Sequence, residues 1–469
     1  MSFIPESFKT KQIYSLLRER ILQGIDTAGT RLPSTRDLAK ELGVSRSLIV
    51  EVYEQLISEG YLEGRQGSGT YVTDLGKGGQ FLCTLLNRTD EISTNRSNTN
   101  SYRFDGVDFR PSLPALEFVP RQNWKKSALY VYDNIHLLDF GYDDPAGNLD
   151  LRNHICSLLH TKGINCLPTQ VIITTGATQA ISILCKLFLT SGDELVTEDP
   201  TGSFIYDIFA SSGARIIPVP VDRFGLRIKD IPSHAKPKFI FVTPSHQFPF
   251  GSIMSIERRI QLLEYARQAS CYVIEDDYDS DFRYNGMPVR ALTELDSERV
   301  IYLGTFSKNL FPALRLGYMV VPWELVEPLI HLKHMTDFHC PTMPQIILAR
   351  FMAERYLERH IYRMKRIYGK RRNRMIANLM QAFGSNVQIS GDAAGLHLVA
   401  DFPGYQFDTR LIALLEERKI RIYPAERFTI VKGRYEDRLI MGFGNVTEQQ
   451  ISNGIATLST MLVENGKAY

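Results

Sequence analysis

Residues 305–318 read Thr-Phe-Ser-Lys-Asn-Leu-Phe-Pro-Ala-Leu-Arg-Leu-Gly-Tyr, and the lysine in this stretch is Lys308. A lysine amine forms a Schiff base with an aldehyde when burial or a nearby cation keeps it partly deprotonated. The hydroxyls of Thr305 and Ser307, together with Arg315, are groups that would bind a phosphate beside this amine. A lysine that follows a strand is commonplace, so the stretch must be interpreted together with other segments.

Two further segments supply what a pyridine-containing cofactor would need. Asp276 and Tyr278 lie two residues apart after the apolar run 272–274, so they project to the same side of an extended chain. A carboxylate keeps a pyridine nitrogen protonated, and a phenol can lie beside the ring oxygen. The segment 176–179, Gly-Ala-Thr-Gln, opens a predicted helix, whose N–H groups and positive end favour a phosphate. Phosphate site, acid, lysine and arginine in this order indicate pyridoxal 5′-phosphate (PLP).

The surrounding sequence alternates between short apolar runs and helical patterns. Such alternation predicts a mostly parallel sheet covered by helices on both faces. A small α+β subdomain is expected after about residue 340, where a long helical pattern, 345–381, precedes two strand signals. The predicted strands of the sheet are 171–174, 194–197, 215–219, 239–242, 272–274, 300–303 and 317–321.

Residues 1–74 have a different pattern. An amphipathic helix is expected over 8–23, and a second helix begins at Ser34 or Thr35 and ends at Gly43. Ser45 caps a third helix, so that two helices joined by a short turn form a helix-turn-helix. The Gly-rich segment 60–72 then predicts a two-stranded wing.

The case for DNA binding by this module rests on a few placed residues. Residues 1–74 contain nine Lys and Arg against ten Asp and Glu, and the whole chain has a net charge of +2, so neither is a polybasic binder. At the start of the third helix, however, Ser45 and Arg46 can meet a phosphate or a guanine edge.

Composition excludes several other classes. The 469 residues are 44% hydrophobic and 23% charged, as in ordinary globular proteins, and the length predicts two to four domains. Six scattered cysteines without metal spacing favour thiols in a reducing compartment. No signal peptide and no bilayer-spanning run is apparent, so a cytoplasmic protein without a membrane partner is expected. No metal site is predicted.

The segment 32–72 closely resembles the GntR-type winged helix-turn-helix, and the resemblance covers about residues 8–73. It implies DNA contacts from Arg36, Ser45, Arg46 and Gly67. Residues 104–465 resemble a fold-type I, aspartate-aminotransferase-like enzyme, through the segments 176–180, 245–251, 275–284 and 305–318.

This second resemblance implies the roles of the candidate site residues. Lys308 would form the Schiff base (aldimine) with PLP, Asp276 would hold the pyridine nitrogen, and Tyr278 would hold the ring hydroxyl. Tyr142 is expected to reach the phosphate of a partner subunit. The residues expected to bind the phosphate of the same subunit are Ala177, Thr178, Ser307 and Arg315.

Two positions depart from the family pattern. Gly202 stands where an aromatic residue usually covers the cofactor ring, unless Phe204 substitutes for it. Ile440 stands where an arginine often binds the substrate carboxylate, which leaves Arg438, on the same face of the predicted strand, as the candidate effector residue. Both departures affect amino-acid chemistry rather than cofactor attachment, and therefore favour sensing over efficient turnover.

Together the two halves resemble the MocR/GabR group of transcription regulators. The predicted fold is multidomain: an N-terminal all-α winged helix-turn-helix, and an α/β PLP-dependent transferase of fold type I with a small α+β C-terminal subdomain. The expected domains are a DNA-binding winged helix-turn-helix over 1–74 (the reader), a flexible polar linker over 75–103 and an aminotransferase-like domain over 104–469 (the body). The large part of the body is expected to run to about 340, and the small part over about 341–469.

The resemblance implies a homodimer that binds a double-stranded DNA operator and senses PLP, a small amino compound, or both. Genes of vitamin B6 or of amino-acid and amine metabolism are the expected targets. The alternative interpretation is a catalytically active PLP-dependent aminotransferase with an accessory DNA-binding domain.

Overall fold

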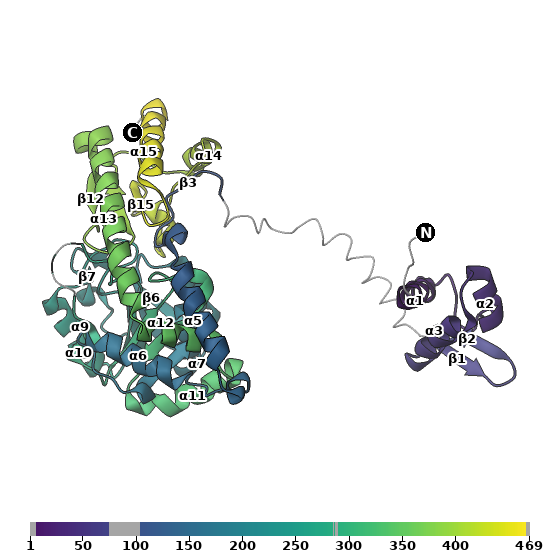
Figure 1. Ribbon diagram of the computed structural model, residues 1–469. Helices are drawn as coiled ribbons and strands as arrows, with labels where there is room; N and C mark the ends of the chain where they lie inside the picture. Colours follow the sequence, from purple (N-terminus) through teal and green to yellow (C-terminus); the bar gives the residue numbers. More distant parts are fainter. Residues whose placement is uncertain (1–5, 75–103, 285, 287–288, 466–469) are drawn as a thin grey trace. The chain divides into compact units, whose positions relative to one another are not determined.

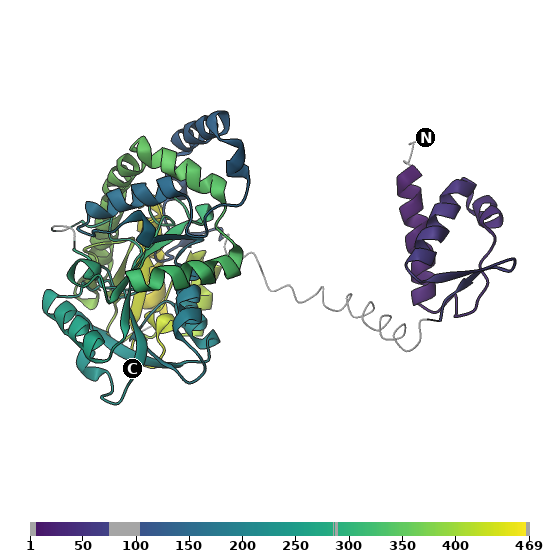
Figure 2. The ribbon, with the colours of Figure 1, turned by 90° about the horizontal axis from the view of Figure 1, so that it is seen from below.

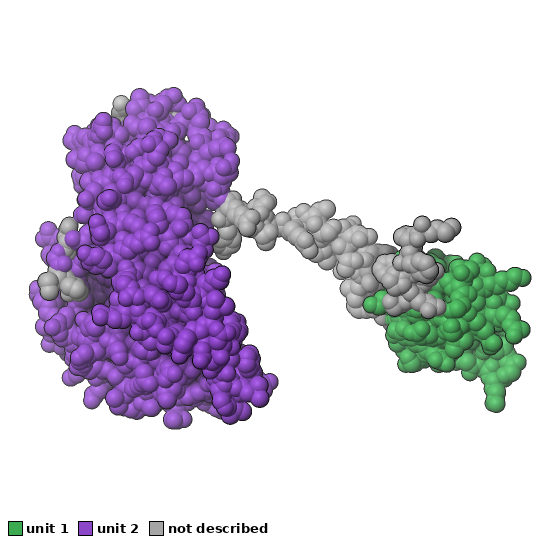
Figure 3. Space-filling view, in the orientation of Figure 1, with its two compact units in different colours: residues 1–103 green, residues 104–469 purple. Residues whose placement is uncertain are grey.

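The computed structural model describes residues 6–74, 104–284, 286 and 289–465. Contacts divide the chain into two units, residues 1–103 and 104–469, which Figure 3 colours separately. The predicted linker, 75–103, lies outside the described residues. No helix of the described segments is both long and apolar enough to cross a bilayer.

The first unit is a three-helix bundle with a hairpin. Leu38, Ile49, Val52 and Leu56 are buried in its core, because apolar residues recur at helical spacing on the facing sides of the helices. Ser34 and Ser45 accept hydrogen bonds from backbone N–H groups and so begin the second and third helices. The elements are α1 (Glu6–Leu22), α2 (Thr35–Leu42), α3 (Arg46–Ser58), β1 (Leu62–Arg65) and β2 (Gly69–Val72).

The second unit is built on an eight-stranded sheet of order β4-β11-β10-β9-β8-β5-β6-β7. The pairs among β10, β9, β8, β5 and β6 are parallel, whereas β11 runs antiparallel to both β10 and β4. The strands are β4 (Val171–Thr174), β5 (Glu194–Asp199), β6 (Arg215–Asp222), β7 (Gly225–Leu226), β8 (Pro237–Val242), β9 (Tyr272–Asp277), β10 (Val300–Thr305) and β11 (Gly317–Val320).

Helices cover both faces of this sheet (Figures 1 and 2). Alternate strand residues enter different clusters: Ile172 and Ile274 pack with α7, α8 and α11, whereas Ile173 and Val273 pack on the other side. The covering helices are α5 (Arg121–Asn134), α6 (Leu149–His160), α7 (Ala177–Phe188), α8 (Ser203–Ser211), α9 (Ile256–Gln268), α10 (Leu292–Leu295), α11 (Trp323–Asp337) and α12 (Thr342–Ala353).

The C-terminal part packs two long helices, which lie side by side in Figure 1, on a three-stranded antiparallel sheet. One short strand from the start of the unit, β3, pairs with β14 and so joins this part to residues 104–113. The elements are β3 (Val107–Asp108), α13 (Tyr356–Phe383), β12 (Gln388–Ser390), β13 (His397–Asp401), α14 (Thr409–Glu417), β14 (Ile420–Arg421), β15 (Arg438–Gly442) and α15 (Glu448–Asn465).

Short 3-10 turns connect several of these elements. They are η3 (Leu116–Phe118), η4 (Leu137–Phe140), η5 (Pro168–Gln170), η6 (Ile228–Asp230), η7 (Pro312–Leu314), η8 (Gly384–Asn386) and η9 (Ala425–Phe428).

The predicted fold class is confirmed, and two local expectations are refined. The helical pattern 345–381 is divided between α12 and α13, because Arg355 adopts a left-handed conformation with φ of 56°. The strand expected over 272–274 continues to Asp277, so that Asp276 belongs to the strand itself.

Candidate cofactor pocket and DNA-reading surface

The edge of the large sheet gathers the predicted cofactor residues. β9 and β10 are parallel neighbours, so Asp276 at the end of one strand lies beside the turn that carries Lys308 after the other. β11 returns antiparallel, with Gly317 opposite both Thr305 and Thr174. Its first residues, and Arg315 just before them, therefore lie at the same edge.

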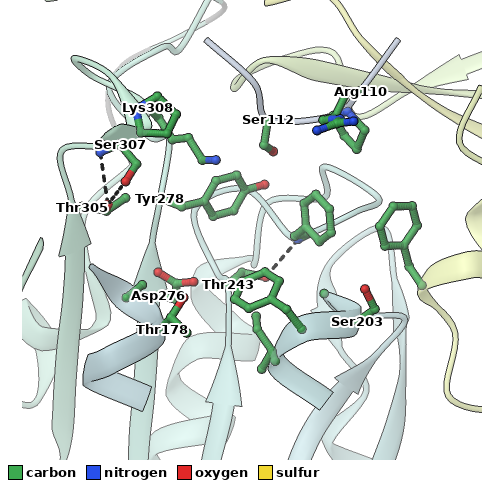
Figure 4. A pocket seen from close by; sticks show the side chains of 18 of the residues that line it. Arg110, Ser112, Thr178, Ser203, Thr243, Asp276, Tyr278, Thr305, Ser307 and Lys308 are labelled. Atoms are coloured by element: carbon green, nitrogen blue, oxygen red, sulfur yellow. Dashed lines mark hydrogen bonds between the residues drawn. The ribbon is translucent and has the colours of Figure 1, made fainter. Parts of the chain in front are cut away.

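A cavity of about 430 Å³ opens at this edge. Figure 4 shows Lys308, Tyr278 and Asp276 around one space. All but one of the predicted lysine and cofactor-binding residues line it, namely Ala177, Thr178, Asp276, Tyr278, Ser307, Lys308 and Arg315.

The end of the cavity where a phosphate is predicted to bind is lined by backbone and side-chain donors. α7 begins at Ala177, and the preceding Gly176 has no side chain with which to cap the helix. Gly176 has φ of +114°, and a Cβ there would lie 3.1 Å from the Arg315 guanidinium. The glycine thus lets this cation approach the positive end of the helix, where the hydroxyls of Thr305 and Ser307 also face the cavity.

Asp276 has the environment that a pyridine nitrogen requires. Its side chain is buried, and Oδ1 has no hydrogen-bond partner among the described residues. Burial, with the neighbouring charge of Asp277, raises the pKa of Asp276 to about 7. A protonated ring nitrogen at Oδ1 would relieve this desolvation, so the residues present fit PLP.

Asp277 keeps its charge although it is buried. Lys162 lies 3.6 Å away, and hydrogen bonds from Ser280 and Tyr302 reach its Oδ2, both at 2.6 Å. Burial opposes ionisation, but these contacts lower the pKa of Asp277 below its usual value. The two adjacent carboxyl groups therefore differ in pKa. Asp277 is surrounded by a cation and hydrogen-bond donors, whereas Asp276 faces the cavity.

The electrostatics of Lys308 suit an amine that must be partly neutral. Burial lowers the pKa of Lys308 below 10.5, and the nearby Arg315 lowers it further, although Asp279 and Asp276 act in the opposite direction. A lower pKa increases the unprotonated fraction, and the unprotonated amine is the nucleophile.

Several pocket residues come from segments that local motifs did not identify. Arg110 and Ser112 follow β3 in the chain. They reach the cavity because β3 pairs with β14, which lies far away in the sequence. Phe248 belongs to the quoted segment 245–251, but its role was not predicted. The remaining unpredicted lining residues are Pro111, Ser203, Ile205, Thr243, Pro312, Tyr423, Arg427 and Phe428.

The two departures from the family pattern have structural counterparts. Gly202 and Phe204 both line the cavity, and a Cβ on Gly202 would lie 3.1 Å from the Phe204 ring. Phe204 therefore fills the space into which a side chain at 202 would project. The structure does not bring Arg438 to this cavity: it lies 3.4 Å from Asp401 and over the rings of Phe250 and Tyr435.

Tyr142 also lies outside the cavity. Its side chain is 87% exposed and stacks on Phe338 with a centroid distance of 5.6 Å. Its predicted role concerns a partner subunit, and a single chain does not test it.

The predicted DNA contacts lie on one small unit. Ser45 caps α3, and Arg46 begins that helix with an exposed guanidinium whose Nε lies 3.5 Å from Thr35 Oγ1. Arg36 is exposed in the first turn of α2, and Gly67 forms the tip of the hairpin with φ of +74°. The residues are thus exposed at the N-terminal ends of the two helices of the helix-turn-helix and on the wing.

Comparisons with known proteins match both units. The family described as aminotransferase class I and II matches residues 121–458, and bacterial regulatory proteins of the gntR family match residues 9–72. The probable rhizopine catabolism regulatory protein MocR of Rhizobium meliloti is 33% identical, over 96% of this chain and 92% of its own. The pyridoxine biosynthesis transcriptional regulator PdxR of Corynebacterium glutamicum is 29% identical, over 97% and 96%.

Solved structures resemble the larger unit. The kynurenine aminotransferase of Pyrococcus horikoshii, in complex with PMP, has a TM-score of 0.71 and 26% identity, covering 82% of this chain and 95% of its own. The α-aminoadipate aminotransferase LysN of Thermus thermophilus, with 23% identity and a TM-score of 0.71 over 79% of this chain and 98% of its own, shares the fold.

Fold, pocket and helix-turn-helix define a DNA-binding transcriptional regulator whose aminotransferase-like domain uses PLP as its cofactor. More narrowly, the chain belongs to the MocR/GabR-type regulators.

Proposed function

We propose that this regulator senses a small amino compound with an acidic group, which enters the cavity above bound PLP and changes operator binding. The observation that carries the proposal is the cavity mouth. Arg110 and Arg427 line it with Tyr423, and Phe204, Phe248 and Phe428 add aromatic surface. Guanidinium groups beside apolar rings suit a carboxylate on a small organic ligand.

Arg427 is the better placed of the two arginines to bind the ligand. Arg110 donates from Nε to Tyr423 Oη at 3.0 Å and lies 3.4 Å from Asp108, so its charge is partly matched. Arg427 is exposed and, within the described part of the chain, has no carboxylate partner; it lies 5.6 Å from the Tyr423 ring. We assign to Arg427 the role that the sequence suggested for Arg438.

The roles proposed for the other residues follow from their contacts. PLP supplies an aldehyde that captures amines. Lys308 provides the amine for attachment, and the positive end of α7 with Arg315 holds the phosphate. Asp276 keeps a proton on the ring nitrogen, Tyr278 donates to the ring oxygen, and Phe204 covers the ring face. Ala177, Thr178 and Ser307 add phosphate donors.

At the level of the whole chain, the proposed units are a reader (1–74), a linker (75–103) and a sensing body (104–469). A homodimer is supported by exposed apolar side chains near Tyr142, including Leu137 and Leu138, which are 81% and 77% exposed. Tyr142 would then face the partner's phosphate. A cytoplasmic location follows from the proposed role on DNA.

The proposal is tested by footprinting on the DNA upstream of the protein's own gene. Protein without PLP, with PLP, and with PLP plus individual amino acids and amines is compared for wild type and for Arg427→Ala. We expect one acidic amino compound to change the footprint of wild type, and at least tenfold more of it to be needed by the variant. An effect of PLP alone, unaltered by any amine, would instead make PLP the effector.

A second function is favoured by the intact lysine and acid: a catalytically active aminotransferase with an accessory reader. Repeated turnover of an amino donor with a keto acid, lost in Lys308→Ala, would establish it. A single conversion of the bound cofactor without turnover would favour sensing.

A further inference from the structure

A buried group of polar side chains lies behind Tyr278 and outside the roles described above. His246 Nδ1 lies 3.0 Å from Asp279 Oδ1 and 3.0 Å from Tyr278 Oη, and His246 Nε2 lies 3.2 Å from the Gly391 carbonyl oxygen. His246 and Asp279 are 2% and 1% exposed. The group therefore connects the cofactor cavity to the turn between β12 and β13 in the C-terminal part.

The partners of His246 determine its protonation. A carbonyl oxygen only accepts hydrogen bonds, so Nε2 must carry a proton in order to bond Gly391. An ionised carboxylate also only accepts, so Nδ1 must carry one in order to bond Asp279. With Asp279 ionised, both ring nitrogens donate, and His246 is then an imidazolium paired with a carboxylate. Burial opposes this charge, but Asp279 raises the pKa of His246 above 6.5.

The neighbouring histidine has the opposite pattern. His397 Nε2 lies 3.0 Å from the Pro249 carbonyl, and Nδ1 lies 3.5 Å from the Ser112 hydroxyl, which can donate. One nitrogen donates and the other accepts, so His397 is neutral. Burial, and then the proximity of His246, lower the pKa of His397 well below its usual value.

The charge of His246 has a consequence for Tyr278. When Nδ1 carries a proton, the Tyr278 oxygen can only accept from it, so the phenolic proton must point elsewhere. Tyr278 lines the cavity, and its proton is therefore available to an acceptor there. We propose that the His246–Asp279 ion pair is a positioning device that fixes Tyr278 as a hydrogen-bond donor to the ring oxygen of PLP.

The backbone around the pair is adapted to it. A Cβ on Gly395, which has φ of +72°, would lie 2.3 Å from Asp279 Oδ2 and 2.3 Å from His246 Cε1. The absence of a side chain at this position lets the C-terminal part close against the ion pair. The other titratable groups that act on His246, Asp279 and Tyr278 are His397, Asp276, Asp277, Glu198 and Lys308.

The three groups His246, Asp279 and His397 also lie close enough together to bind a metal ion. A metal would need an unprotonated nitrogen on His246, and both of its nitrogens are directed at acceptors. Metal analysis of the purified protein discriminates these two arrangements: a stoichiometric metal would overturn the ion-pair assignment.

The first experiment observes the ring nitrogens by NMR in full-length protein labelled with ¹⁵N-histidine. Signals are assigned by their loss in His246→Asn and, for the neighbour, in His397→Asn. At pH 7 we expect two protonated nitrogens for His246, and one protonated with one bare nitrogen for His397. A bare nitrogen on His246 would overturn the proposal. The protonation state is read from the wild-type spectrum, and the variants serve only to assign its signals.

The second experiment follows the visible absorption of the PLP-bound protein against pH. A proton donor stabilises negative charge on the ring oxygen, so its loss favours the protonated form of the chromophore. We expect His246→Asn to raise the midpoint by about one pH unit, a tenfold change in proton affinity. His360→Asn, which alters a buried histidine on α13 outside the cavity, is the matched control and should leave the midpoint unchanged.

A double-mutant cycle separates positioning from a direct effect of charge. Tyr278→Phe should raise the midpoint as His246→Asn does, and the two changes together should add little beyond either. Full additivity would show that His246 does not act through Tyr278. An unshifted midpoint in a folded His246→Asn protein would equally refute the positioning role.

Discussion

At the scale of single residues, Asp276 shows how the cofactor pocket trades stability for binding. Its Oδ1 is buried without a partner, and burial raises its pKa from 3.8 to about 7. A carboxyl with a raised pKa binds protons more strongly in the folded state, so the cofactor-free protein should lose stability as the pH rises from about 4 to 7.

Asp276→Asn is therefore expected to have two opposite effects. It should raise the free energy of unfolding of cofactor-free protein at pH 8 by about 1–3 kcal/mol, because no charge is buried. It should also weaken PLP binding at least tenfold, because a charge-assisted hydrogen bond of about 1.5–3 kcal/mol is lost. Thermal unfolding and fluorescence titration measure the two effects.

Glu275→Gln is the matched control for this prediction. Glu275 is adjacent and buried, and burial raises its pKa to about 7 as well, but it accepts from the Leu292 and Thr293 backbone rather than facing the cavity. The Glu275→Gln variant should bind PLP with the same affinity as wild type. Equal losses in both variants would contradict the assigned role of Asp276.

Arg46 is the residue on which DNA recognition should depend most. Its guanidinium is exposed at the start of α3, where a base edge can be reached. We expect Arg46→Ala to weaken operator binding by about 1–3 kcal/mol, measured by gel shift at fixed salt. Arg223→Ala, in the body, should have no effect; unchanged affinity in Arg46→Ala would exclude α3 as the reading helix.

At the scale of elements, the close approach of α7 to β11 shapes the proposed phosphate site. A Cβ on Gly317 would lie 2.9 Å from the Gly176 Cα, so two glycines permit this contact. Because β11 runs antiparallel to β4 and β10, the residue preceding it returns to their C-terminal edge, and Arg315 meets the start of α7.

Gly176→Ala is expected to displace Arg315 and to weaken PLP binding by about tenfold. It should also reduce stability, because φ of +114° is strained for any residue with a Cβ. Gly192→Ala controls for the strain alone, since Gly192 has φ of +91° but open space around its Cβ. If equilibrium titration showed the same PLP affinity for both variants, the close approach would have no part in phosphate binding.

At the scale of the whole molecule, the proposed homodimer would let two near-neutral DNA-binding units act together. Linking two weak readers in one dimer raises avidity without any new contact. The exposed apolar side chains of η4 are the surface on which such a dimer would depend.

Leu138→Arg tests this dimer. A charge on a buried dimer surface is costly, so we expect sedimentation velocity to show a monomer at micromolar concentration and operator affinity to fall at least tenfold. Leu295→Arg, at an exposed leucine on α10, should remain dimeric. Monomeric wild-type protein would refute the proposed assembly.

Much of the site could be predicted from the sequence, because each of its motifs consists of residues close together in the chain. Ser45 caps its helix through its own neighbours, and Asp276 and Tyr278 share a face because strand residues alternate. The order of the motifs along the chain was sufficient to predict PLP as the cofactor, since each motif lies beside the end of a strand in one sheet.

The sequence by itself determined the fold class, the cofactor and the residues that line the cavity around Lys308. Only the tertiary structure decided that Arg427 rather than Arg438 lies at the cavity mouth, that Phe204 fills the space above Gly202, and that His246 contacts Tyr278. For Arg427 and His246 the physical reason is separation: they meet residues distant in the chain, and no local periodicity records which distant side chains meet. Phe204 and Gly202 are close in the chain, and there the backbone at the start of α8 decides where the ring lies. Motifs specify chemistry within a few residues, whereas packing between the large sheet and the C-terminal part selects the partners.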